Sequence, residues 1–472
     1  MKPTMQAPPS GAGAIAAGQG PAGASAPSVL AAVVADLARA LDAAGVPHAF
    51  LRGLDAYPEL GPGSDVDLCV RPRDVPAFTR ALEASCARRG AVIHERFRAG
   101  FLAQFHLYAR EGTGRHRFLT VDVHTAEAAL GVPFLEAGEL LSERRDPHGF
   151  RVPEEDVSAL ANFLTPYLSG GAVVGRYAGG LAAVLAAGGA RVRNLAGRLF
   201  GVREGEALCE EILAGDHGAL RRRARRRRRA LLARRLLRAP LRSSLAFLAF
   251  AHGARLRPLW RPRGRFVTFL GTDGAGKSTL AEAVARELAP AFRAAESSTF
   301  HLRPGLLPQL DRIVHLGRRT QGEADWCRPH RAAPSGPLLS NLRVAWYALD
   351  YFAGYALRVL PRRRRHALIL FDRYFHDYLI DPERCRVRRG TLLARLLAPL
   401  VPQPDAVIVV TAELEAVLAR KQELPPEESA RQLLAYERLA RRGGRFHLVR
   451  NDGPVEEAVE TVVGALFQGG AA

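Results

Sequence analysis

The chain contains very little lysine. Lysine and arginine together account for 67 of the 472 residues, but the only lysines are Lys2, Lys277 and Lys421. The formal net charge of +20 therefore comes almost entirely from arginine. A surplus of this size is typical of proteins with anionic partners such as nucleic acid, nucleotides or an acidic membrane face. Because arginine is spread through a chain rich in alanine, glycine and leucine, overall composition explains the surplus better than a dedicated nucleic-acid-binding face does.

Cysteine is also scarce. The five cysteines are scattered, odd in number and never spaced as C-x-x-C: Cys69, Cys86, Cys209, Cys327 and Cys385. This pattern indicates neither a disulfide framework nor a zinc site. It fits a reducing compartment, and we predict a cytoplasmic protein.

Long apolar runs are absent. No stretch approaches the roughly 18 consecutive apolar residues of a membrane-spanning helix, so we expect no transmembrane span, although association with a membrane surface stays open. Residues 1–28 are rich in Ala, Gly, Pro and Ser, and prolines and glycines interrupt any apolar core of a signal peptide. We predict a disordered tail over 1–28.

The rest of the chain divides into three regions by its pattern. Residues 29–165 alternate helix-like and strand-like segments, which predicts an α+β domain. Residues 166–262 predict an Arg-rich helical linker, which includes RRRARRRRRALLARRLLR at 221–238. This run is either a solvated basic helix or a surface that binds anionic lipid or nucleic acid electrostatically. The following segment, 241–260, mixes apolar and basic residues, and it could lie on a membrane surface or pack against a neighbouring domain.

Residues 263–472 show βα repeats. Strands are expected before residue 271 and at 297–302, 366–372, 405–411 and 445–450, separated by helices. Near-continuous apolar strands of this kind predict an α/β domain with a parallel sheet covered on both faces.

The segment FLGTDGAGKSTL (269–280) has the form G-x-x-x-x-G-K-[ST]. In such a loop, backbone N–H groups and a helix N-terminus converge on phosphate oxygens, and the lysine reaches the β- and γ-phosphates. In a chain that otherwise uses arginine, lysine stands where a compact ammonium is required. We predict ATP binding by Gly271, Gly274, Ala275, Gly276, Lys277, Ser278 and Thr279, with Ser278 as a Mg²⁺ ligand.

A second motif, ALILFDRYFHDYLID, places a carboxylate at the end of an apolar strand. A parallel sheet brings such a strand end beside the phosphate loop, so Asp372 is expected to hold Mg²⁺ directly or through water. Arg373 follows and could clamp a second phosphate.

Together, FLGTDGAGKST, FDRYFHDYL and VRNDGPVEEAV resemble the thymidylate kinase-like group of P-loop kinases over about 264–468. The resemblance implies ATP- and Mg²⁺-dependent phosphate transfer to a nucleoside monophosphate-like acceptor. It places Asp273 at the acceptor's sugar, Arg373 at its phosphate and Tyr374 beside it. The family's R-E-P-G segment is reduced here to HLRPG, which leaves Arg303 as a further acceptor ligand. A lid segment supplies three more cations: Arg420, Lys421 and Arg431. On this reading the catalytic residues are Lys277, Asp372, Arg373 and Arg420.

The front half carries a second acidic motif. In SDVDLCV, Asp65 and Asp67 share one face of a strand, and Asp122 in FLTVDVHTA could join them to hold two Mg²⁺ ions. With Gly53 upstream, these residues resemble the polymerase-β-type nucleotidyltransferases. Leu54 stands where that family has a second small residue, which puts triphosphate binding in doubt, and we expect His124 to be solvated or packed rather than a ligand.

The sequence therefore predicts a two-domain enzyme, a nucleoside monophosphate kinase-like phosphotransferase preceded by a nucleotidyltransferase-like domain. Three alternatives stay open. The acceptor could be a sugar or another small metabolite, the activity could be nucleotidyl transfer at the N-terminal carboxylates, or the protein could be a basic ATP-regulated module on nucleic acid or membrane. The sequence does not indicate an oligomeric state.

Overall fold

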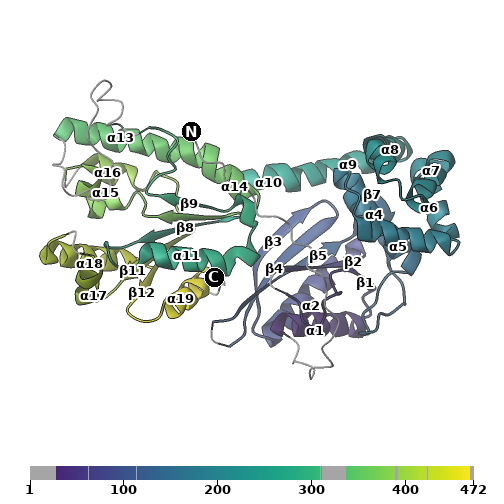
Figure 1. Ribbon diagram of the computed structural model, residues 1–472, viewed down its shortest axis with the longest axis horizontal. Coiled ribbons are helices and arrows are strands. Elements are labelled where there is room, and N and C mark those ends of the chain that lie inside the picture. Colours follow the sequence, from purple (N-terminus) through teal and green to yellow (C-terminus); the bar gives the residue numbers. More distant parts are fainter. Residues whose placement is uncertain are drawn as a thin grey trace.

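The computed structural model describes residues 28–61, 63–112, 114–308, 310, 336–388, 392–421 and 424–467. The predicted disordered tail lies outside this range except for Ser28, and so does Cys327. Among the described residues, no helix is both long enough and apolar enough to cross a membrane. Figure 1 shows two sheets side by side, with a group of helices beyond the N-terminal one.

The N-terminal sheet is mixed, with strand order β1-β2-β5-β4-β3. Its central pair, β2 and β5, is parallel and the other pairs are antiparallel. Helices α1 and α2 cover one face, because their apolar residues recur every three or four positions and are buried there. The elements are α1 (Val29–Ala43), β1 (His48–Arg52), β2 (Ser64–Val70), η1 (Pro72–Asp74), α2 (Val75–Arg88), β3 (Val92–Ala99), β4 (Leu102–Arg110) and β5 (His116–His124).

A helical region follows, together with a small hairpin. Its core draws on the hairpin and on α4 to α8, so this region is packed around apolar side chains of its own. The elements are β6 (Ala126–Ala129), β7 (Val132–Glu136), α3 (Ala137–Leu140), α4 (Glu155–Gly170), α5 (Gly175–Ala186), α6 (Ala190–Phe200), α7 (Val202–Leu213), α8 (His217–Arg238), α9 (Pro240–Ala251), the π-helix η2 (His252–Leu256) and α10 (Arg257–Trp260).

The arginine run forms α8, and its two faces differ. Leu220, Ala224, Arg227 and Leu231 recur at helical spacing and are buried. Arg227 is fully buried, where its guanidinium binds both carboxylate oxygens of Glu211 at 2.8 and 3.0 Å. One arginine of the run is therefore part of the core, while most of the others point outward.

The C-terminal sheet is parallel throughout, with strand order β12-β11-β8-β10-β9. One face is packed against α11 and α19 and the other against α13 and α18, so both faces are buried as the apolar runs predicted. The strands are β8 (Arg265–Leu270), β9 (Ser298–His301), β10 (Leu368–Asp372), β11 (Ala406–Thr411) and β12 (Phe446–Arg450). The helices are α11 (Lys277–Leu288), η3 (Ala289–Ala291), η4 (Ala294–Glu296), α13 (Pro337–Gly354), the π-helix η7 (Tyr355–Val359), α14 (Leu360–Arg364), α15 (Asp377–Ile380), η8 (Pro382–Cys385), α16 (Leu392–Leu397), α17 (Leu414–Arg420), α18 (Pro426–Ala440) and α19 (Val455–Phe467).

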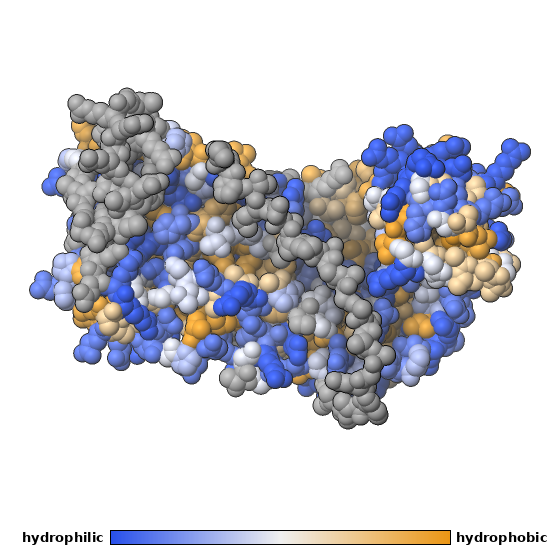
Figure 2. All heavy atoms as spheres, viewed as in Figure 1, coloured by the Kyte–Doolittle hydropathy of each residue, from blue (hydrophilic) through white to orange (hydrophobic). Residues whose placement is uncertain are grey.

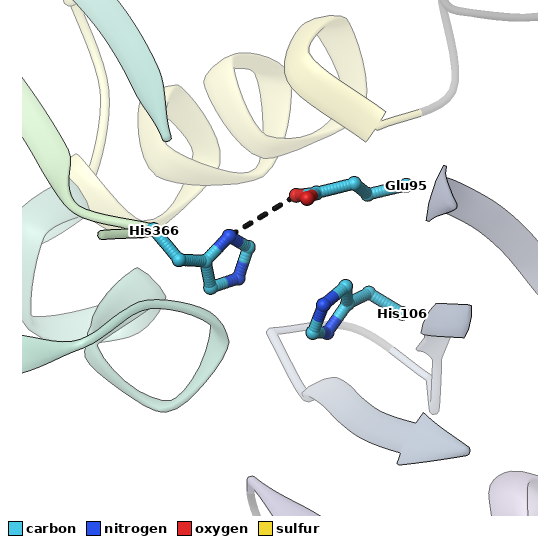
Figure 3. A group of neighbouring side chains, drawn as sticks. All are labelled: Glu95, His106 and His366. Atoms are coloured by element: carbon cyan, nitrogen blue, oxygen red, sulfur yellow. Dashed lines mark ion pairs between the residues drawn. The ribbon is translucent and has the colours of Figure 1, made fainter. Parts of the chain in front are cut away.

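A polar cluster joins the two sheets. Figure 3 shows Glu95 of β3, His106 of β4 and His366, which precedes β10, and their ligand-type atoms lie within 4.8 Å of one another. The guanidinium of Arg263 lies in the same cluster, 3.2 Å from Glu95 Oε1 and 3.2 Å from His106 Nε2. Because Arg263 supplies the cation, we interpret the cluster as an ion-pair contact between the sheets.

Candidate active site

The glycine loop joins β8 to α11, at the carboxyl ends of the parallel strands. Gly276 has φ +84°, and a Cβ at this position would lie 2.2 Å from Asn451 Nδ2. A Cβ on Gly271 would lie 2.2 Å from the carbonyl oxygen of Val410. Only glycine allows the loop to approach β11 and Asn451 this closely, which fixes the path of its backbone N–H groups.

Lys277 is the first residue of α11 and is buried. Its ammonium donates a 2.6 Å hydrogen bond to the carbonyl oxygen of Thr272 and lies 3.8 Å from Asp273 Oδ1. Burial lowers the pKa of Lys277 to about 7, and the nearby charge of Arg373 acts in the same direction. An ammonium that is held in place within its own loop and desolvated by burial is suited to bind an anion.

Ser278, in the first turn of α11, contacts Asp372 at the end of β10. Ser278 Oγ donates a 2.8 Å hydrogen bond to Asp372 Oδ2, and His301 Nδ1 lies 3.5 Å from the same oxygen. Burial alone raises the pKa of Asp372, but His301, Lys277 and Ser278 outweigh it and hold the pKa at about 2. The other oxygen, Oδ1, is buried and has no hydrogen-bond partner in the described part of the chain. An ionised carboxylate with one unpaired oxygen beside a hydroxyl is a donor set that fits Mg²⁺.

Arg373 contacts Asp273, and the resemblance places both residues at the acceptor. Its guanidinium pairs with Asp273 of the glycine loop and donates a 2.6 Å hydrogen bond to Asp377 Oδ2. Asp377 is fully buried and also accepts a 3.0 Å hydrogen bond from the hydroxyl of Tyr436. Arg384 forms a second ion pair with Asp273. Two guanidinium groups therefore meet beside the phosphate loop, around one carboxylate.

Tyr374 lies elsewhere than the resemblance implied. Its side chain is buried against Phe266, Tyr351 and Phe371, and its hydroxyl donates to the carbonyl oxygen of Pro402. Arg373 has a φ of +74°, which turns the chain sharply at the end of the strand and directs the Tyr374 side chain into the core. Tyr374 is thus a core residue and not an acceptor contact.

Arg303 follows β9 at the same edge of the sheet. Its guanidinium lies 3.1 Å from Asp350 Oδ2 and 4.4 Å from the centre of the Tyr347 ring. Asp350 is fully buried and also accepts hydrogen bonds from the backbone N–H groups of Gly305 and Leu307. This carboxylate fixes the segment after β9, and Arg303 is held there.

The lid cations take different positions. Arg420, at the end of α17, donates to the carbonyl oxygen of Asn451 at 3.3 and 3.4 Å. Asn451 in turn donates a 2.9 Å hydrogen bond to the carbonyl oxygen of Ala275, so Arg420 lies over the glycine loop. Arg431 is on α18, where it pairs with Glu428 and donates to the carbonyl oxygen of Ile380. Lys421 directly follows α17, with its Cβ 3.4 Å from the position of a Cβ on Gly274.

Several residues of this site did not stand out in the sequence. His301 and Asn451 lie within the quoted segments HLRPG and VRNDGP, at the ends of β9 and β12, where parallel strands converge. Asp377 stands four residues after Arg373, and this spacing was the available signal for their ion pair. Arg384 and Asp350 had no such signal for their contacts with Asp273 and Arg303, because these partners are far away in the sequence.

The N-terminal carboxylates lie together but are already paired. Asp67 and Asp122 are register partners on β2 and β5. Arg52 Nε lies 2.8 Å from Asp67 Oδ2, and Arg52 Nη1 lies 2.9 Å from Glu127 Oε1, a buried carboxylate that sequence reasoning missed. Despite burial, His124 and Arg52 bring the pKa of Asp67 to about 2.

The three-residue acidic cluster expected here differs in one member. The ligand-type atoms that lie within 4.8 Å of one another are those of Asp67, Asp122 and His124, whereas Asp65 is outside this group and exposed. His124 is half-buried and its Nε2 lies 2.9 Å from Asp67 Oδ1, so this histidine is packed against the carboxylates. Gln104 donates 3.0 Å hydrogen bonds to both oxygens of Asp122, whose pKa burial raises to about 6.

The glycine loop between β8 and α11, and the acidic strand end of β10 beside it, define the C-terminal part as a P-loop NTPase fold. No protein-family model matches the sequence, and a comparison with curated proteins finds no match either. Among solved structures, the thymidylate kinase from Ehrlichia chaffeensis is 16% identical with a TM-score of 0.31, and covers 43% of this chain and 100% of its own. The thymidylate kinase from Candida albicans is 17% identical with a TM-score of 0.32, and covers 43% of this chain and 89% of its own.

Proposed function

We propose that the C-terminal domain transfers the γ-phosphoryl group of ATP to a nucleoside monophosphate-like acceptor. The observation that carries this proposal is the position of the Arg373–Asp273–Arg384 cluster. It lies beside the phosphate loop and shares Asp273 with the surroundings of Lys277. A nucleotide-hydrolysing switch needs one phosphate site, whereas a kinase with a phosphorylated acceptor needs a second anion site next to the first. Two guanidinium groups at that position are suited to an acceptor phosphate.

The chain's own residues would divide the work as follows. The loop N–H groups and Lys277 hold the donor phosphates, and the lysine offsets charge that develops on the transferred group. Ser278 and Asp372 would hold Mg²⁺, which supplies charge neutralisation between the β- and γ-phosphates. Arg373 and Arg384 orient the acceptor phosphate, whose oxygen forms the new P–O bond as the bond to ADP breaks. Arg420, bound over the loop through Asn451, is positioned to reach the donor phosphates on a small movement of α17.

The proposal is tested with the full chain, ATP, Mg²⁺ and a panel of nucleoside monophosphates and sugars, by measuring ADP release. We expect turnover with a nucleoside monophosphate and its loss in Lys277→Ala. Arg286→Ala, an exposed substitution on the same helix, should retain full activity. Turnover in Lys277→Ala equal to that of the native chain would remove the loop from the mechanism.

A sugar or another small metabolite is the main competing acceptor. Arg373 and Arg384 favour a phosphorylated acceptor over a neutral one, because two guanidinium groups around one carboxylate are suited to bind the oxygens of a phosphate. Turnover with an unphosphorylated sugar, and none with any nucleoside monophosphate, would replace the proposed acceptor class.

We do not assign nucleotidyl transfer to the N-terminal carboxylates, because Arg52 and His124 already bind both oxygens of Asp67. If these carboxylates carry no nucleotidyl transfer, the full chain releases no pyrophosphate from nucleoside triphosphates. Release that disappears in Asp67→Asn would reinstate this activity.

A further inference from the structure

α9 presents its leucines to the outside. Leu241, Leu245 and Leu248 are 80%, 66% and 60% exposed. They recur at intervals of four and three residues and therefore share one face of the helix. At the end of α8, Leu237 is 83% exposed. An exposed apolar surface of this kind calls for an explanation, because single scattered leucines are common on surfaces but a continuous row is not.

The opposite face of α9 explains why the leucines point outward. On that face, Ser243 donates a 3.0 Å hydrogen bond to the carbonyl oxygen of Arg235 in α8, and Phe250 lies against two glycines that leave room for its ring. A Cβ on Gly131 would lie 2.3 Å from Phe250 Cβ, and a Cβ on Gly100 would lie 3.3 Å from it. This close contact fixes the rotation of α9, so the leucines cannot turn inward without losing it.

The helix that precedes α9 in the chain, α8, carries a basic surface. The outer face of α8 carries Arg222, Arg225 and Arg229, all exposed, on the side away from the buried Leu220 and Leu231. Between His217 and Ala251 the chain has no acidic residue. Figure 2 shows hydrophilic and hydrophobic residues next to each other on the surface of this helical region.

We propose that the outer faces of α8 and α9 bind an anionic lipid surface. The arginines by themselves would fit nucleic acid equally well, because phosphates attract them in either setting. The leucines decide between the two, since they gain nothing from a nucleic-acid backbone but gain free energy when they enter the boundary between headgroups and acyl chains. A second copy of the chain would cover the leucines but would bring another +20 of charge against the arginines. This binding is independent of the phosphoryl transfer proposed above.

The test is co-sedimentation of the full chain with vesicles of phosphatidylcholine plus phosphatidylserine, compared with vesicles of phosphatidylcholine alone. We expect binding to the mixed vesicles only, weakened by added salt. The triple variant Leu241→Ser, Leu245→Ser and Leu248→Ser should reduce partitioning by roughly tenfold. The variant Arg222→Gln, Arg225→Gln and Arg229→Gln should reduce it by a similar factor.

The matched control is Leu392→Ser, Leu396→Ser and Leu400→Ser, which alters three leucines of comparable exposure in and after α16. It should bind as the native chain does, and all variants should keep a native circular dichroism spectrum and ATP turnover in solution. No binding to anionic vesicles, or equal binding by the leucine variant, would overturn the proposal. Binding to duplex DNA that is unchanged in the leucine variant would also overturn the proposal. A concentration-dependent dimer that the leucine variant abolishes would do the same.

Discussion

Ser278 and Asp372 are 94 residues apart in the chain and are joined by a 2.8 Å hydrogen bond between Oγ and Oδ2. The contact places the first turn of α11 against the end of β10. It holds one carboxylate oxygen and leaves the other, Oδ1, buried and without a hydrogen-bond partner among the described residues. The two residues therefore act as a unit, and a change to one alters the other.

Asp372→Asn should lower kcat/KM for ATP turnover by about a hundredfold or more, because an amide supplies a weaker ligand for a divalent cation. Ser278→Ala should have a smaller effect, and the double variant should cost less than the sum because the two share one role. The measurement is steady-state kinetics over a range of Mg²⁺ concentrations. Glu282→Gln, an exposed change on α11, serves as the control. An unchanged Mg²⁺ dependence in Asp372→Asn would contradict the assignment.

Gly276→Ala should abolish ATP binding and destabilise the protein, because the new Cβ would lie 2.2 Å from Asn451 Nδ2. Gly443 has φ +66° with nothing within 4 Å of its Cβ position, so Gly443→Ala adds backbone strain of about 1 kcal/mol without a clash. Comparing thermal denaturation and ATP affinity for the two variants separates strain from crowding. Equal losses in both would show that the contact with Asn451 is unimportant.

Arg227→Met should lower the free energy of unfolding of the helical region by about 3 kcal/mol, because it leaves the nearly buried Glu211 without its bidentate partner. Arg226 is the next residue toward the N-terminus, and its side chain is 77% exposed. Arg226→Met should change stability by no more than about 0.5 kcal/mol. Urea denaturation followed by circular dichroism distinguishes the two. A small effect in both variants would mean that Arg227 is not a core residue.

Acid should destabilise the contact between the two sheets. Burial, with the charge of His106 next, lowers the pKa of His94 to about 3, and burial also lowers that of His106 to about 3. Between about pH 3 and 6.5 the unfolded chain binds protons at these histidines that the folded chain does not, so stability rises with pH across this window.

Each histidine contributes at most about 1.4 kcal/mol per pH unit there. His94→Phe keeps the edge contact with the ring of Phe467, which lies 4.7 Å away, and removes one titrating group. Its urea midpoint should therefore depend less steeply on pH between 4 and 6 than that of the native chain. His217→Phe, an exposed change at the start of α8, should leave the slope unchanged. A slope in His94→Phe that matches the native slope would refute the assignment of this pH dependence to His94.

Local pattern was sufficient for some parts of the site and not for others. The glycine loop was predictable because its geometry depends on consecutive residues, in which glycines, a lysine and a serine must follow one another. The end of β10 was predictable because parallel strands bring their carboxyl ends to one edge. Tyr374 was predicted wrongly, because the resemblance gives its neighbourhood in the sequence but not the direction of its side chain after Arg373.

The sequence by itself determined the type of sheet, through apolar runs separated by helical spacing, and the location of the glycine loop, through a motif whose geometry is local. Only the tertiary structure decided which charges meet. It paired Arg373 and Arg384 with Asp273, placed Arg52 on Asp67, put Arg227 into the core and turned the leucines of α9 outward. In a chain with arginine nearly everywhere, composition cannot say which guanidinium is buried. That depends on which carboxylate lies within about 3 Å after folding, and such partners come from distant parts of the chain.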